Sequence, residues 1–140
     1  MLGLKYEVSM VDLFGLMTEY GASDLHLVAG TKPCIRINSD IERIDELSEL
    51  KPEHLIYLLL EVVSEEEYRR FEENWELDFS YAIPGLARFR GNIMKQRGSI
   101  AMVFRAIPFT IPSFDDLGMI PQIKDLCYLN RGLVLVTGPT

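Results

Sequence analysis

The chain has 140 residues, of which 48% are hydrophobic and 25% are charged, which is enough for one globular domain with a core of its own. Its formal net charge of −7 disfavours nucleic acid and anionic membranes as partners, since both repel an acidic surface. The longest apolar runs are too short for a membrane span, so no membrane insertion is expected. No metal site is expected either, because neither cysteine has metal-ligand spacing to a histidine.

The first third of the chain predicts a helix followed by three short strands. Ser9 is a typical N-cap, and Gly21 suits the position just after the end of a helix. The residues that follow alternate in polarity, which places Asp24 and His26 on one face of a strand. The expected elements are a helix over 10–20 and strands over 24–28, 35–37 and 41–44.

Two helices, a further strand and a long hairpin are predicted next. Pro52 opens the first helix, and Ser64 and Glu67 form a capping box at the start of the second. The expected buried residues of the two helices are Leu55, Ile56, Leu59, Leu60, Val63, Tyr68, Phe71 and Trp75. Strands are expected over 76–81, 86–95 and 99–107, and a last helix over 121–129.

Consecutive strands joined by short turns favour an antiparallel sheet, with the helices gathered on one face. This order predicts an α+β fold for residues 1–107. Residues 108–131 are rich in proline and are expected to form a linker with short helices. Beyond them, Leu133 to Thr137 is an apolar, β-branched run typical of a buried parallel strand. We therefore interpret residues 132–140 as the start of a second, truncated domain.

The hairpin carries arginines on one face. Arg88 and Arg90 share that face because side chains alternate along a strand. If Arg97-Gly98 forms a two-residue turn, Arg90 falls directly opposite Arg105, and like charges so placed destabilise a sheet. The arrangement therefore requires an anion, which is either a carboxylate of the same domain or a phosphate held by the guanidinium forks.

The last residues raise the possibility of a nucleotide site. A buried strand that runs into Gly138, Pro139 and Thr140 matches the opening of a P-loop. The rest of that motif, a further spacer followed by Gly-Lys-Ser or Gly-Lys-Thr, is not among these residues. On the pattern alone, a simple turn after a strand is the alternative.

Several segments together resemble the retraction ATPases of type IV pili, a family within the secretion-ATPase superfamily. These segments are residues 21–27, 78–80, 87–90, 103–105 and 131–140. The resemblance implies a PAS-like N-terminal domain, an antiparallel sheet with helices on one face, followed by a linker and the truncated first strand of a RecA-like ATPase domain. It further implies that the parent protein is a homohexamer that powers pilus retraction in twitching motility.

The resemblance also implies roles for particular residues. Arg88, Arg90 and Arg105 would reach the phosphates of the nucleotide, and Gly138, Pro139 and Thr140 would open the P-loop. Asp24 and His26 match a signature that is interpreted as structural or as part of a subunit contact. One departure lies at 38–40, where the family usually has a glycine in the turn; Asn38 could adopt the positive φ instead.

The parent protein would bind ATP and Mg²⁺ and hydrolyse ATP. The 140 residues alone are expected neither to hydrolyse ATP nor to hold a cofactor, because the P-loop lysine, the metal ligands and the catalytic base are not among them. No catalytic residue is therefore assigned in this chain.

The expected partners are further copies of the chain, its own and neighbouring ATPase domains, and the machinery at the pilus base. The expected location is the cytoplasm, at the periphery of the inner-membrane pilus machinery. Two alternatives remain at this point: the same domain of a pilus-extension or type II secretion ATPase, and a stand-alone PAS-like sensor that binds a small ligand.

Overall fold

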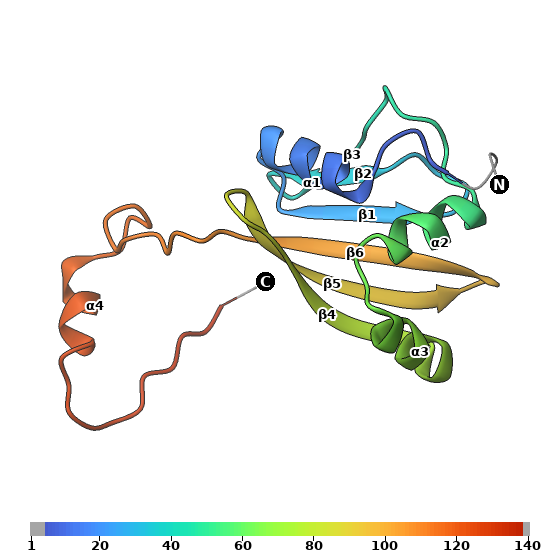
Figure 1. The fold of residues 1–140 in the computed structure, drawn as a ribbon. Coiled ribbons are helices and arrows are strands. Elements are labelled where there is room, and N and C mark those ends of the chain that lie inside the picture. Colours follow the sequence, from blue (N-terminus) through green and yellow to red (C-terminus); the bar gives the residue numbers. More distant parts are fainter. Residues whose placement is uncertain (1–4, 139–140) are drawn as a thin grey trace. The chain divides into compact units, whose positions relative to one another are not determined.

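The computed structural model describes residues 5–138 and divides after Phe109 into two compact units. Within its described residues, 5–109, the first unit contains three helices and six strands (Figure 1). These are α1 Met10–Glu19, β1 Asp24–Val28, β2 Cys34–Ile37, β3 Asp40–Arg43, α2 Pro52–Leu60, α3 Glu65–Asn74, β4 Glu76–Ile83, β5 Ala87–Gln96 and β6 Ser99–Ile107. Among residues 5–138, no helix has the length and apolar character needed to cross a bilayer.

The six strands form one antiparallel sheet in the order β3-β2-β1-β6-β5-β4. Strands β1 and β6 lie side by side at its centre, although they are far apart in the sequence (Figure 1). This pairing joins the N-terminal meander to the C-terminal hairpin in a single sheet. The predicted α+β class, with an antiparallel sheet, is confirmed.

The helices begin where the sequence predicts. Ser9 caps α1 through a reciprocal capping box with Asp12, and Ser64 caps α3 in the same way with Glu67. These contacts satisfy backbone N–H groups that a helix start leaves without partners. Gly21 follows α1 with a φ of 62°, a left-handed conformation that suits glycine.

Aromatic rings of α1 and the sheet form the centre of the core. The ring of Phe14 stacks on Phe89 at 4.0 Å between centroids and meets Phe104 edge-on at 5.1 Å. Gly91 leaves room for this packing, because a Cβ there would lie 2.5 Å from a ring carbon of Phe79. Bulky rings on neighbouring strands thus require a residue without a side chain between them.

Two tight turns settle the strand register. Arg97 and Gly98 have φ values of 49° and 81°, as a two-residue turn of the hairpin type requires. Arg90 consequently lies opposite Arg105, as predicted. At the turn between β2 and β3, Asn38 adopts the positive φ that the sequence suggested, and Ser39 does so as well.

The predicted inner face of α2 and α3 is partly wrong. Ile56 and Leu60 are 44% and 55% exposed, whereas Leu58 is fully buried. The buried stripe of α2 is therefore rotated toward Leu58. It continues past the helix end at Leu60 to the buried Val62, and Val63 is partly buried against the same core. Trp75 is 62% exposed because it leaves α3 in a left-handed conformation, which turns it away from the core.

Among its described residues, the second unit contains one short helix, α4 Pro121–Leu126, which ends earlier than the predicted 121–129. The strand expected over 133–137 is not formed, and Leu133, Leu135 and Val136 are largely exposed. A strand needs a neighbour for its backbone hydrogen bonds, and no described residue pairs with this run. Pro139 and Thr140 lie outside the described residues.

Candidate functional site

The face of the sheet opposite α1 carries a line of charged side chains. The strand register places Arg90, Arg105, Asp24 and Arg36 directly opposite one another across β5, β6, β1 and β2. We refer to these four residues as the arginine row. Three positive side chains and one carboxylate thus follow each other across the middle of the sheet.

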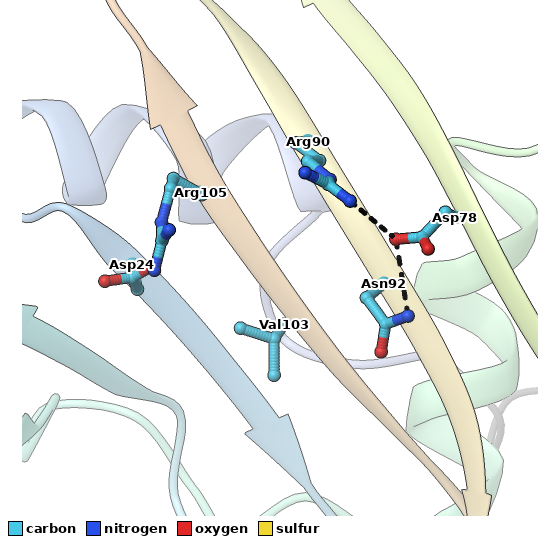
Figure 2. A pocket seen from close by; sticks show the side chains of 6 residues that line it. All are labelled: Asp24, Asp78, Arg90, Asn92, Val103 and Arg105. Carbon is cyan, nitrogen blue, oxygen red and sulfur yellow. Dashed lines mark hydrogen bonds and ion pairs between the residues drawn. The ribbon is translucent and has the colours of Figure 1, made fainter. Parts of the chain in front are cut away.

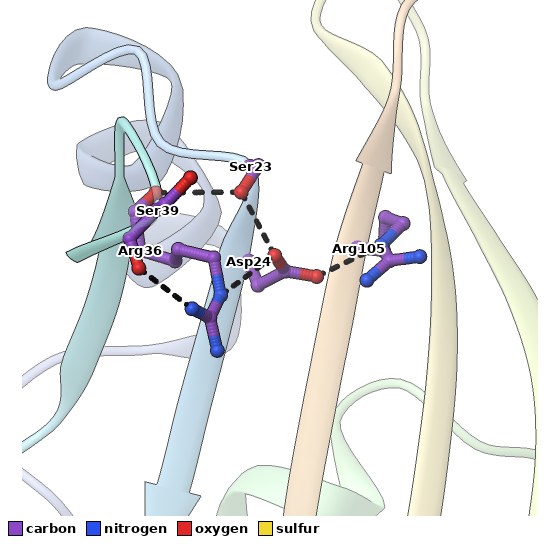
Figure 3. A network of polar contacts seen from close by, with 5 residues as sticks. All are labelled: Ser23, Asp24, Arg36, Ser39 and Arg105. Atoms are coloured by element: carbon purple, nitrogen blue, oxygen red, sulfur yellow. Dashed lines mark hydrogen bonds and ion pairs between the residues drawn. The ribbon is translucent and has the colours of Figure 1, made fainter. Parts of the chain in front are cut away.

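Asp24 is the buried centre of the arginine row (Figure 3). Only 3% of the residue is exposed. Its Oδ1 accepts a hydrogen bond of 2.9 Å from Nε of Arg105. Its Oδ2 accepts one of 2.8 Å from the Ser23 hydroxyl and lies 3.4 Å from Nε of Arg36. A buried carboxylate is costly unless it is paired, and here both oxygens have partners.

These partners decide the charge state of Asp24. Burial acts to raise the pKa of the carboxyl group, but hydrogen bonds from Ser23 and Arg105 and the nearby positive charge act in the opposite direction and prevail. The pKa therefore lies below its ordinary value. Asp24 is a carboxylate at neutral pH and binds both neighbouring arginines as an anion.

Arg90 has a different and weaker partner. One of its Nη atoms lies 3.8 Å from Oδ1 of Asp78, and Asn92 donates a hydrogen bond of 3.4 Å to the same oxygen (Figure 2). Both side chains of this ion pair are more than half exposed, so water screens it strongly. Arg90 can therefore exchange Asp78 for another anion at little cost.

An open depression of about 320 Å³ lies over this part of the sheet (Figure 2). Its lining residues are Asp24, Asp78, Arg90, Asn92, Val103 and Arg105. The side chain of Arg105 is 70% exposed here although its partner Asp24 is buried. Because its hydrogen bond to Asp24 uses Nε, both Nη nitrogens remain available to an anion in the depression.

Arg88 is not among the residues that line this depression. Arg88 shares the face with Arg90 but is paired with Ile107 of β6, closer to the end of that strand. Gly138 belongs to the second unit. Nucleotide contacts of these residues stay a prediction.

His26 lies two residues beyond Asp24 on β1, between Cys34 of β2 and Val103 of β6. Its Nε2 is buried, and no group among residues 5–138 forms a hydrogen bond with it. Burial lowers the pKa of the imidazole, and the charge of Asp24 offsets this only in part. Its predicted role in structure or subunit contact stays a prediction.

Sequence reasoning missed three members of this site: Ser23, Arg36 and Asp78. The alternation within the predicted strand over 35–37 placed Arg36 on a polar face, but it gave no neighbour for it. Arg36 meets Asp24 through the pairing of β1 with β2, and Asp78 meets Arg90 through the pairing of β4 with β5. The pairing of β1 with β6 then brings Arg105 to Asp24 from the other end of the unit.

No protein-family model matches the chain. The type IV pilus retraction ATPase PilT of Pseudomonas aeruginosa is 40% identical over 95% of this chain, which corresponds to 38% of that protein. The type IV pilus ATPase PilU of the same organism is 35% identical over 91% of this chain and 33% of its own length. The chain thus spans well under half the length of the curated relatives it matches.

Solved structures give the same result. A crystal structure of the pilus retraction motor PilT with bound ADP matches 95% of this chain and 39% of its own, with a TM-score of 0.80 and 40% identity. The Legionella pneumophila ATPase DotB matches 84% of this chain and 34% of its own, with a TM-score of 0.61; at 17% identity this likeness concerns the fold alone. The chain is therefore a homologue of the type IV pilus retraction ATPase PilT over the part of PilT that it spans.

Proposed function

We propose that the chain is the N-terminal domain of a hexameric ATPase that powers type IV pilus retraction, and that its arginines contact the nucleotide. The observation that carries the proposal is the 40% identity to a pilus retraction ATPase over 95% of the chain. The ATPase domain would follow the sheet, with residues 132–140 leading into its P-loop. ATP and Mg²⁺ would be held mainly by that domain.

The geometry of the arginine row supports a phosphate contact. Arg90 and Arg105 lie opposite each other on β5 and β6, so their positive charges repel and destabilise the sheet. A phosphate group between them would relieve this repulsion and accept hydrogen bonds from both guanidinium groups. Arg88 extends the same face toward the end of β6 and would contact another part of the polyphosphate or the neighbouring domain.

This arrangement gives ATP hydrolysis a way to move two domains. An arginine that contacts the γ-phosphate from the sheet would hold the sheet against the ATPase domain while ATP is bound. Loss of the γ-phosphate would weaken the contact and release the sheet. Part of the nucleotide-binding energy would thus be available as domain movement.

The two alternatives have less support. A pilus-extension or type II secretion ATPase would share the fold, but the relative that is 40% identical over 95% of this chain is a retraction ATPase. A stand-alone sensor would leave the 40% identity to a pilus retraction ATPase over 95% of the chain unexplained. Self-association, contacts with the pilus base and a position at the cytoplasmic side of the inner membrane follow from the retraction proposal.

The proposal can be tested in the complete ATPase. Replacing Arg90 by alanine should lower the rate of ATP hydrolysis by on the order of 10²-fold, as for other charged contacts to a transferring phosphoryl group. Arg70→Ala is the matched control, since Arg70 is an exposed arginine of α3, away from the sheet face. Equal rates for wild type and Arg90→Ala would contradict the nucleotide role, and normal twitching in a strain that lacks the protein would contradict the retraction role.

A further inference from the structure

We propose that Asp24 is a positioning residue that fixes Arg105 by its Nε and thereby presents the two Nη nitrogens to a phosphate. This inference rests on the proposed nucleotide role of the arginine row. It concerns a residue that would not touch the nucleotide itself. Three features carry it: the rigidity of Asp24, the division of its two oxygens between separate partners, and the geometry of the guanidinium group.

Asp24 is held in one place by its strand. It lies on β1, which has β2 on one side and β6 on the other, so its backbone is paired with Arg36 and with Arg105. The side chain is almost entirely buried, with 5% of its surface exposed. A carboxylate in such a position has little freedom to follow a moving partner, so it acts as a fixed point on the sheet.

The two oxygens of Asp24 have separate partners. Oδ2 accepts the hydrogen bond from Ser23 and faces Arg36, whose own Nη1 donates to the backbone oxygen of Ser39 at 2.9 Å (Figure 3). These contacts orient the carboxylate from the β2 side. Oδ1 is thereby directed toward β6, where it accepts the hydrogen bond from Arg105.

The guanidinium group is planar and carries its five N–H donors in fixed directions. When Nε is bound to Asp24, the plane of the Arg105 group is set and its Nη end points outward from the anchor. That end can bind two oxygens of a phosphate at once. Arg90 has no comparable anchor among the described residues, because Asp78 is half exposed and contacts an Nη atom at 3.8 Å.

Positioning and simple electrostatics predict opposite effects for the loss of Asp24's charge. If Asp24 acted only through its negative charge, its neutralisation would tighten the binding of an anion nearby. If Asp24 positions Arg105, its neutralisation weakens a strong hydrogen bond to Nε and anion binding becomes weaker. Asp78 provides the matched control, because it is a second carboxylate lining the same depression.

The experiment is a titration of the 140-residue chain with inorganic tripolyphosphate at low ionic strength, followed by NMR of the backbone and of the arginine Nε–Hε groups. In Asp24→Asn, the dissociation constant should rise on the order of tenfold, because the hydrogen bond that holds Nε of Arg105 is weakened when the carboxylate loses its charge. The Arg105 Hε signal should also exchange faster with water. In Asp78→Asn, the dissociation constant should be unchanged or lower.

Arg105→Lys provides a second test that does not depend on the folding of a variant at the buried Asp24. Lysine keeps the charge but has no Nε–H that can be held while a fork of two donors faces outward. It should therefore bind tripolyphosphate about as poorly as Arg105→Ala. Binding equal to wild type would show that charge alone matters and would overturn the positioning role.

The remaining outcomes separate the two proposals. Tighter binding in Asp24→Asn, as in Asp78→Asn, would overturn the positioning role and leave the nucleotide role standing. Binding that is absent in wild type, or that neither Arg90→Ala nor Arg105→Ala weakens, would overturn the nucleotide role and the positioning role with it.

Discussion

Arg90 and Arg105 lie directly opposite each other on β5 and β6, yet each is bound by a different carboxylate. The partner of Arg105 is the buried Asp24, and that of Arg90 is the exposed Asp78. Two arginines that share one face and one register therefore differ in what they contribute to the fold. This difference yields the first prediction.

Arg105→Ala should destabilise the first unit, by about 1–2 kcal/mol, because it removes a charged hydrogen bond from a buried carboxylate. The cost is limited because Arg36 and Ser23 still contact Asp24. Arg90→Ala should change the free energy of unfolding by less than about 0.5 kcal/mol, since its ion pair is exposed. Urea unfolding of the two variants measures both values, and equal losses would contradict the assignment of Asp24 as the partner that matters.

Gly91→Ala should destabilise the core by about 1–3 kcal/mol, as overpacking commonly does. The new Cβ would lie 2.5 Å from a ring carbon of Phe79 and 2.8 Å from one of Phe104. Gly15→Ala is the control: it lies within α1, and a Cβ there meets nothing within 4 Å. That variant should be neutral or stabilised by up to about 1 kcal/mol. Thermal or urea unfolding of both variants decides between packing at Gly91 and a general effect of removing glycine.

The features that could be predicted from the sequence are those that depend on residues close together in the chain. The alternation of the hairpin and its Arg97-Gly98 turn were sufficient for the register that opposes Arg90 and Arg105. Ser9 and Ser64 likewise predicted the starts of α1 and α3. All these features rest on local backbone preferences.

Features that depend on distant contacts were not predictable in this way. The partner of Arg105 required the pairing of β1 with β6, which no local pattern encodes. The exposure of Ile56 and Leu60 depends on how α2 is rotated against the sheet, and an apolar stripe fixes that rotation only approximately. The run over 133–137 has the composition of a strand, but a strand also needs a neighbour, which lies outside its own sequence.

Acidification should destabilise the first unit in two stages. The folded-state pKa of His26 is lowered, chiefly by burial, so the unfolded chain binds a proton at a higher pH and stability falls as the pH drops below about 6.5. The pKa of Asp24 is also lowered, so its contribution is present above the unfolded value of about 3.9 and is lost as the pH falls through the folded value.

His26→Gln removes the first titrating group and should flatten the dependence of the urea midpoint on pH between about 7 and 5. His54→Gln is the control, because His54 is the other histidine of the chain and lies at the start of α2. The interpretation fails if His26→Gln leaves the slope unchanged or if His54→Gln removes it instead.

The apolar run near the C-terminus should promote association of the 140-residue chain with itself. Leu135 is 74% exposed and Val136 is 94% exposed, and the run has no strand partner among the described residues. Exposed β-branched segments without a charge pair readily with other chains. Val136→Lys should therefore lower the concentration-dependent mass measured by light scattering, while the unfolding midpoint of the first unit stays the same.

Ile56→Lys is the matched control, because Ile56 is an apolar residue of α2 that is 44% exposed and the substitution adds the same charge there. If only Ile56→Lys reduces association, the contact between copies lies on the helices of the first unit, and the run over 133–137 has no part in it.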